Sequence, residues 1–113
     1  MAEKQTETQF TNEIIREAKQ LGWKVAHFGN TVKYVKKAGG GYKVIPDKNA
    51  AGFPDLVMVK GKRIVFAELK LDHTAPTESQ MEWLKALQET ETEVYLWRPK
   101  DRGEIDRVLA GSP

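Results

Sequence analysis

Residues 54–70 read PDLVMVKGKRIVFAELK and predict the centre of the fold. An apolar run over 56–59 is followed by a turn at Gly61 and by a second run over 63–70. Two such runs on either side of a short glycine turn predict an antiparallel β-hairpin. We therefore expect two paired strands near the centre of a sheet.

The residues before this hairpin predict a helix and a strand. Apolar side chains recur at helical spacing over 6–21, and Gly22 follows as a stop signal. Thr6 and Gln9 have the spacing of a capping box, in which each side chain bonds to the backbone N–H of the other residue. Residues 23–28 are short and alternating, so they predict a strand.

Residues 29–52 are expected to form a long irregular loop. They contain five glycines, and the three consecutive glycines at 39–41 predict a flexible tip. A short strand over 42–45 is the regular element expected there. A loop of this length in a small domain is usually functional or mobile.

The chain after the hairpin predicts a helix, a strand and a last helix. Pro76 stands at a favoured position for a helix start, with Thr74 or Ala75 near the cap. A strand over 93–97 and a helix over 101–109 complete the order α-β-β-β-α-β-α. This order predicts a mixed α/β domain with a central sheet flanked by helices.

The composition is that of one ordinary globular domain over 1–113. Hydrophobic residues make up 40% and charged residues 30%, which argues against a disordered chain. The absence of cysteine excludes disulfides and cysteine-bound zinc. No apolar run reaches the roughly 20 residues of a membrane span, and the first residues lack the apolar stretch of a signal peptide. We therefore expect no membrane association and a cytoplasmic location.

Three charged residues of the hairpin form a candidate site. Glu68 and Lys70 face the same side of their strand because side chains alternate, and the pairing puts Asp55 at the corresponding end of the neighbouring strand. Two converging carboxylates suit Mg²⁺, and a nearby lysine can hold or deprotonate an attacking water. A solvated strand end with a cross-strand ion pair has the same spacing. Spacing alone therefore leaves both interpretations open.

A longer string of motifs carries a resemblance to a known family. In order along the chain, the motifs are GFPDLV at 52–57, AELK at 67–70, TESQMEWL at 77–84 and VYLWRP at 94–99. Together they resemble the VRR-NUC domain of the PD-(D/E)xK nuclease superfamily, over about residues 6–109. The resemblance implies a restriction-endonuclease-like core and a metal-dependent nuclease.

The resemblance also implies a role for each matched residue. Asp55 and Glu68 would bind Mg²⁺ or Mn²⁺ together with the backbone carbonyl of Leu69. Lys70 would be the catalytic lysine. Gln80, on the following helix, would touch the active site or the phosphate backbone.

Members of this family carry an acid in the first helix as well. Glu7 occupies that position relative to Gly22, and Glu13 is the alternative. Glu7 can equally serve to complement the helix dipole. Where relatives often have glutamine after the phenylalanine, this chain has Thr11. His27, on the strand over 23–28, is expected to pack or to face phosphate rather than to bind a metal.

Lysines are concentrated within the predicted loop, at Lys33, Lys36, Lys37, Lys43 and Lys48. We expect them to contact phosphates, which positions a duplex without reading its bases, although a solvated lysine loop has the same composition. No base-reading motif is present, so the sequence predicts recognition of DNA shape.

Stand-alone VRR-NUC domains of this size resemble phage and bacterial proteins that act as homodimers on branched DNA. By this analogy, we expect a homodimer that cuts four-way (Holliday) junctions in the bacterial cytoplasm, or in the host cytoplasm for a phage protein. A nuclease directed at flaps or nicks is an alternative. A non-catalytic DNA-binding module on the same fold and a small adaptor domain are the hypotheses from other classes.

Overall fold

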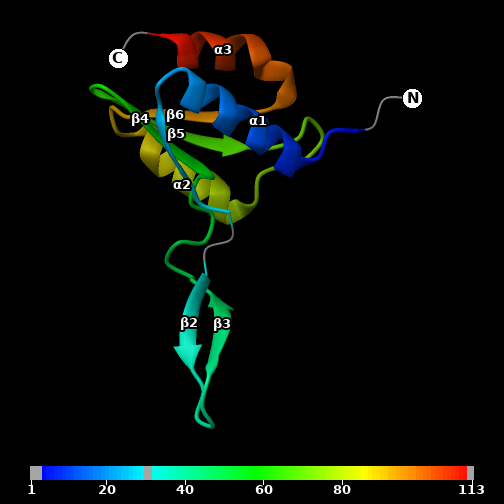
Figure 1. Ribbon diagram of the computed structural model, residues 1–113, viewed down its shortest axis with the longest axis vertical. Helices are drawn as coiled ribbons and strands as arrows, with labels where there is room; N and C mark the ends of the chain where they lie inside the picture. Colours follow the sequence, from blue (N-terminus) through cyan, green and yellow to red (C-terminus); the bar gives the residue numbers. More distant parts are fainter. Residues whose placement is uncertain (1–3, 30–31, 112–113) are drawn as a thin grey trace.

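The computed structural model describes residues 4–29 and 32–111, which form a mixed α/β domain with a projecting hairpin (Figure 1). The domain is built on a four-stranded sheet in the order β1-β4-β5-β6. The strands are β1 (Lys24–His27), β4 (Leu56–Lys60), β5 (Arg63–Leu69) and β6 (Glu93–Trp97). The predicted fold class is confirmed at this coarse level.

The central hairpin predicted from residues 54–70 is present. Strands β4 and β5 pair antiparallel, with Leu56 opposite Ala67 and Lys60 opposite Arg63. Strand β1 pairs antiparallel with β4, and β6 pairs parallel with β5. A parallel pair needs a crossover connection, and helix α2 (Glu78–Gln88) lies in that connection.

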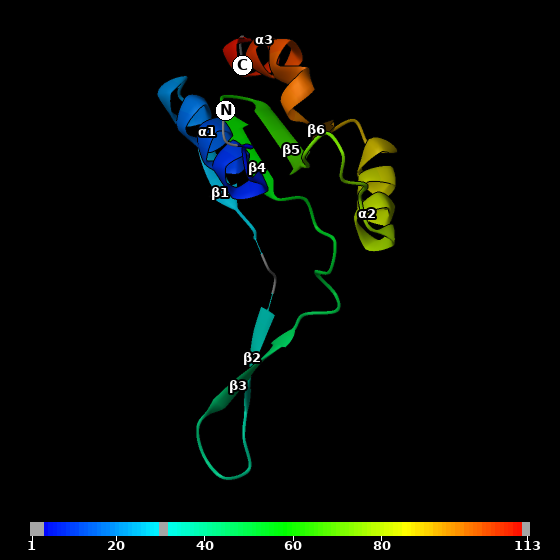
Figure 2. The ribbon, with the colours of Figure 1, turned by 90° about the vertical axis from the view of Figure 1, so that its right-hand side faces the viewer.

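The helices cover both faces of the sheet. Figure 2 shows α1 (Glu7–Gln20) and α3 (Arg102–Ala110) on one side of the strands and α2 on the other. A short 3₁₀ turn, η1 (Pro99–Asp101), leads from β6 into α3. Of the residues that the structure describes, no helix is long and apolar enough to cross a membrane.

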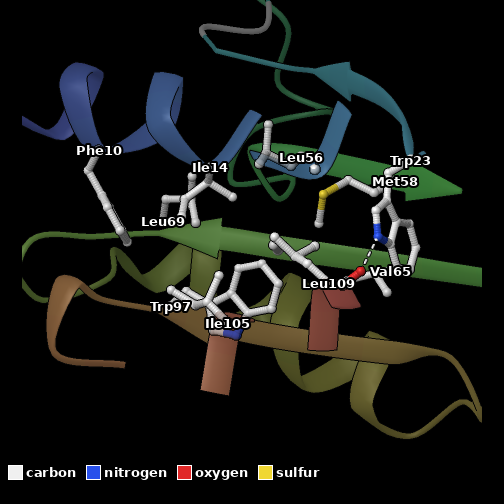
Figure 3. Close-up of a cluster of buried hydrophobic side chains, with 12 residues drawn as sticks. Phe10, Ile14, Trp23, Leu56, Met58, Val65, Leu69, Trp97, Ile105 and Leu109 are labelled. Carbon is white, nitrogen blue, oxygen red and sulfur yellow. Dashed lines mark hydrogen bonds between the residues drawn. The ribbon is translucent and has the colours of Figure 1, made fainter. Parts of the chain in front are cut away.

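The main core lies between β5 and the pair α1 and α3 (Figure 3). Val65, Ala67 and Leu69 alternate along β5 and are fully buried in this layer. The indole N–H of Trp23 donates to the carbonyl oxygen of Leu109 at 2.8 Å, which ties α3 to the start of β1. Alternation then directs the even-numbered residues of β5 toward the α2 face.

Helices α1 and α2 both begin with a capping box. Gln9 N–H donates to Thr6 Oγ1 at 3.1 Å and Thr6 N–H donates to Gln9 Oε1 at 2.8 Å, so the predicted cap of α1 is confirmed. The predicted start of α2 is wrong. The cap is Thr77, whose Oγ1 accepts from Gln80 N–H at 3.2 Å, and the helix begins one residue later. The capping box satisfies the backbone N–H groups of both Thr77 and Gln80. Pro76 has no backbone N–H, so it leaves none to be capped at its own position.

The prediction of an irregular loop over 29–52 is also wrong in its central part. Strands β2 (Val32–Lys36) and β3 (Tyr42–Pro46) form a separate antiparallel hairpin that projects from the domain (Figures 1 and 2). Strand β3 agrees with the strand expected over 42–45, but β2 was not predicted. Tyr34 and Val35 are adjacent in β2, so its sequence lacks the strict apolar–polar alternation that normally identifies a strand. The part of the predicted loop at residues 30 and 31 lies outside the described residues.

Candidate functional site

Asp55 connects three strands of the sheet at one end. If the ladder between β4 and β5 is continued by one residue beyond Leu56 and Ala67, Asp55 stands opposite Glu68. Its Oδ2 accepts from the backbone N–H of Leu69 at 3.0 Å. Its own carbonyl oxygen accepts from the N–H of Phe28, at the end of β1, at 2.7 Å. The carboxyl group is therefore held at a fixed place beside β5.

Glu68 is a buried acid, with only 1% of its surface exposed. Its Oε1 accepts from Gln80 Nε2 at 3.2 Å, while its Oε2 is buried without a hydrogen-bond partner among the described residues. Burial is the largest influence on this group, followed by the adjoining Asp55 carboxyl, and together they raise the pKa of Glu68 to about 9. Two carboxylates in such proximity repel unless they share a proton or a cation.

Lys70 follows β5 directly and is also buried, with 8% of its surface exposed. Its backbone N–H donates to the carbonyl oxygen of Trp97 at 3.0 Å, which continues the pairing with β6 past the end of β5. The positive charge of Lys70 opposes the rise in the pKa of Glu68. The three residues predicted from the hairpin are thus brought together.

A pocket of about 490 Å³ opens at this end of the sheet. The side chains predicted for the site that line it are Asp55, Lys70, Gln80 and Glu7, and the other lining residues are Thr8, Thr11, His27 and Gly29. Glu68 is not part of the lining. Its carboxyl lies beside two residues that do line the pocket, Gln80 and Asp55.

The two candidate acids of α1 lie in different places. Glu7, the first residue of the helix, lines the pocket, and its charge contributes to the raised pKa of Glu68. Glu13 accepts a hydrogen bond from Gln5 and lines a separate polar depression on α1. Of these two acids, the structure brings Glu7 to Asp55 and Glu68. The hydroxyl of Thr11 donates to the carbonyl oxygen of Glu7 at 2.8 Å.

Gly52 is a site residue that sequence reasoning missed. It has φ +81°, and a Cβ atom there would lie 2.4 Å from the carbonyl carbon of Ser79, the residue before Gln80. Such a contact is impossible without moving α2, so only glycine allows this approach. Phe53 packs edge-on against Trp83 of α2, with ring centroids 5.1 Å apart. The Gly-Phe pair thus docks the start of α2 against the strand that carries Asp55.

Arg98 is a second residue that was missed. Its Nη1 donates to the carbonyl oxygens of Leu71 and Thr74, the latter at 2.7 Å. These residues belong to the connection between Lys70 and α2. Arg98 therefore holds the segment that leaves the site. The VYLWRP string at 94–99 contains this arginine, but the string does not show which groups it binds.

Among the lysines predicted for DNA binding, the four whose side chains the structure describes do not line the pocket. Lys36 lies in β2, Lys43 in β3, and Lys37 and Lys48 next to these strands, all with exposed side chains. Lys33 is in β2, but its side chain lies outside the described residues. The hairpin that carries them projects away from the sheet (Figure 2).

The donor set suits a hard divalent cation with few protein ligands. In the described ranges, no three His, Cys, Asp or Glu side chains form a group that could hold a metal ion. Mg²⁺ is usually bound by one or two carboxylates, with water and phosphate oxygens completing its shell. The unpartnered Oε2 of Glu68 beside the Asp55 carboxyl is the kind of atom that such a cation satisfies. The residues present therefore fit the predicted metal.

The chain matches no protein-family model, no curated protein and no solved structure.

Proposed function

We propose that this protein is a metal-dependent DNA endonuclease with a restriction-endonuclease-like core of the VRR-NUC type. The observation that carries the proposal is the buried Glu68, which has one unpartnered oxygen and lies beside Asp55. A surface ion pair would leave Glu68 exposed, and a binding module has no use for paired carboxylates that repel phosphate. Burying a carboxyl group without a full set of partners lowers stability, which supports a function that requires it.

In this proposal Asp55, Glu68 and the backbone carbonyl of Leu69 hold Mg²⁺ or Mn²⁺. The bound cation would supply Lewis-acid activation of the scissile phosphate and of the attacking water. Glu68 must give up its proton to bind a cation, so binding and deprotonation of this residue are coupled. Gln80 orients the Glu68 carboxyl through its hydrogen bond.

Lys70 is proposed as the catalytic lysine. Lys70 lines the pocket and its charge acts on Glu68, so its ammonium group could hold the attacking water and offset the charge that develops on the phosphate. Glu7 lies across the pocket on α1 and can accept a hydrogen bond from that water.

For the substrate we propose branched DNA, with the four-way junction first, cut by a homodimer. The support is indirect: no motif reads bases, and the exposed lysines of the hairpin suit phosphate contacts that are independent of sequence. A two-fold dimer with two pockets would match the symmetry of a junction. Flapped and nicked DNA are the alternatives within the same activity.

A cleavage assay with a labelled substrate panel tests this proposal. The panel holds duplex, single strand, 5′ and 3′ flaps, splayed arms and a four-way junction, each with Mg²⁺, Mn²⁺ or EDTA. Lys70→Ala is compared with Lys62→Ala, an exposed lysine in the turn between β4 and β5. We expect metal-dependent cutting that is lost in Lys70→Ala, retained in Lys62→Ala, and fastest on the junction. DNA binding by the wild type without any cutting would instead support the non-catalytic DNA-binding module.

A further inference from the structure

We propose that one face of the projecting hairpin binds unpaired nucleotides, with Tyr34 and Tyr42 as stacking surfaces for the bases. This hairpin face is defined as Tyr34, Lys36, Tyr42 and Val44. The inference rests on the proposed function, because it specifies which part of a DNA substrate the hairpin contacts.

The strand register places these four residues on one side of the hairpin. Tyr34 is opposite Val44, and Lys36 is opposite Tyr42. Directly opposed residues of an antiparallel pair share a face, and residues two apart on one strand share it as well. The two tyrosines are therefore diagonal neighbours on the same surface.

The hairpin face is exposed to a degree that is unusual for such residues. The exposed fractions are 72% for Tyr34, 67% for Tyr42 and 55% for Val44. A two-stranded hairpin by itself is only marginally stable in water. Large aromatic side chains kept in water on such an element indicate that a partner covers them.

Charge determines which partner fits. Lys36, Lys37, Lys43 and Lys48 are exposed, and Asp47 is the only acid in the sequence over 32–48. The Asp47 carboxyl is itself engaged, because its Oδ1 accepts from the N–H of Asn49 at 3.1 Å. A second copy of the hairpin would bring lysines against lysines. A polyanion with flat apolar bases matches both the charge and the tyrosines, as in proteins that bind single strands.

The hairpin is attached at the rim of the candidate active-site pocket. His27 and Gly29 line the pocket where the chain leaves β1 for the hairpin, and Asp55 lines it where the chain returns to β4. The N–H of Phe28 donates to the carbonyl oxygen of Asp55, and this hydrogen bond joins the two chain segments at the point where the hairpin meets the sheet. Nucleic acid with a phosphate in the pocket would therefore lie next to the place where the hairpin meets the sheet. At a branch point, the nucleotides beside the cut are the ones with unpaired bases to offer.

The test is binding of a fluorescent dT oligonucleotide and of a duplex of equal length, measured by anisotropy in EDTA. The whole chain with Lys70→Ala serves as the parent, so that no strand is cut. Tyr34→Ala/Tyr42→Ala is compared with Tyr34→Phe/Tyr42→Phe, which keeps the rings, and with Tyr34→Leu/Tyr42→Leu, which keeps the apolar bulk. Since the side chains lie outside the core, circular dichroism of all variants should match the parent.

We expect the Ala and Leu variants to bind the dT oligonucleotide roughly tenfold or more weakly, the Phe variant to bind as the parent does, and duplex binding to change by less than about threefold. Unchanged binding by the Ala variant would overturn the inference. Full binding by the Leu variant would also overturn it, since it would indicate apolar contact without stacking. If the wild type cuts no DNA but binding still depends on the rings, this inference holds while the proposed nuclease function fails.

Discussion

Gln80 Nε2 donates to Glu68 Oε1 at 3.2 Å, and the same Gln80 side chain accepts from the N–H of Thr77 at 2.8 Å. One amide therefore fixes the start of α2 and the position of a buried carboxyl group. The helix cap and the candidate site share Gln80, whereas Thr77 belongs to the cap alone. Mutating the two residues one at a time therefore separates the contribution of the cap from that of the site.

Replacing Gln80 with Ala should reduce DNA cleavage by about 10- to 100-fold, because Glu68 loses the group that orients it. The matched control is Thr77→Ala, which removes the other half of the capping box and leaves Gln80 in place. That control should lose about 1 kcal/mol of unfolding free energy while its single-turnover rate stays near that of the wild type. Equal rates for the two variants would show that Gln80 acts only as a cap.

Replacing Gly52 with Ala should destabilise the protein by about 2 kcal/mol or more, because its φ is positive and a Cβ would meet the backbone of Ser79 at 2.4 Å. Chemical denaturation measures this change. Gly39→Ala is the control, since no atom lies within 4 Å of its added methyl group, and it should be close to neutral. A neutral Gly52→Ala would contradict the close contact between this segment and α2.

The stability of the metal-free protein should fall as the pH rises from about 5 to 9. The pKa of Glu68 is raised to about 9 in the folded state, above its ordinary value of 4.5, so unfolding at neutral pH releases a proton. Stability from this group is complete below pH 4.5 and is lost as the pH approaches 9, by at most about 1.4 kcal/mol per pH unit. Denaturation at several pH values in EDTA measures the slope.

Glu68→Gln should flatten this slope and raise the melting temperature of the metal-free protein at pH 8. Glu91→Gln, at an exposed position between α2 and β6, should leave the slope as in the wild type. An unchanged slope in Glu68→Gln would contradict the raised pKa, because it would show that this carboxyl is already ionised in the folded protein over this pH range.

Mg²⁺ should raise the melting temperature of the wild type, because a cation that binds only the folded state stabilises it. At ten times the dissociation constant, the gain is about 1.4 kcal/mol. The shift should be absent in Asp55→Asn and present in Asp72→Asn, whose carboxyl accepts from Lys100 N–H instead. Equal shifts in both variants would place the cation elsewhere.

The convergence of Asp55, Glu68 and Lys70 was predictable because it depends on local rules. A glycine turn fixes the register of the central hairpin, and the pleat of β5 fixes which side chains share a face. The cap of α1 follows from the spacing of Thr6 and Gln9 in the same way.

What the sequence did not predict depends on how distant elements pack. The contact of Gly52 with Ser79 and the bonds from Arg98 to Leu71 and Thr74 form only when α2 and β6 are docked. Which acid of α1 reaches the pocket depends likewise on the rotation of that helix over the sheet. Strand β2 was missed because the adjacent Tyr34 and Val35 break its alternation, whereas its pairing with β3 depends on residues about ten positions away.

The most direct test of the central claim is the single-turnover cleavage of a labelled four-way junction in Mg²⁺ by the wild type, Lys70→Ala and Lys62→Ala. The proposal predicts cutting by the wild type and Lys62→Ala, a loss of at least about 1,000-fold in Lys70→Ala, and none in EDTA for any of them. Cleavage by Lys70→Ala at the wild-type rate, or undiminished cleavage in EDTA, would contradict the assignment of this pocket as a metal-dependent nuclease site.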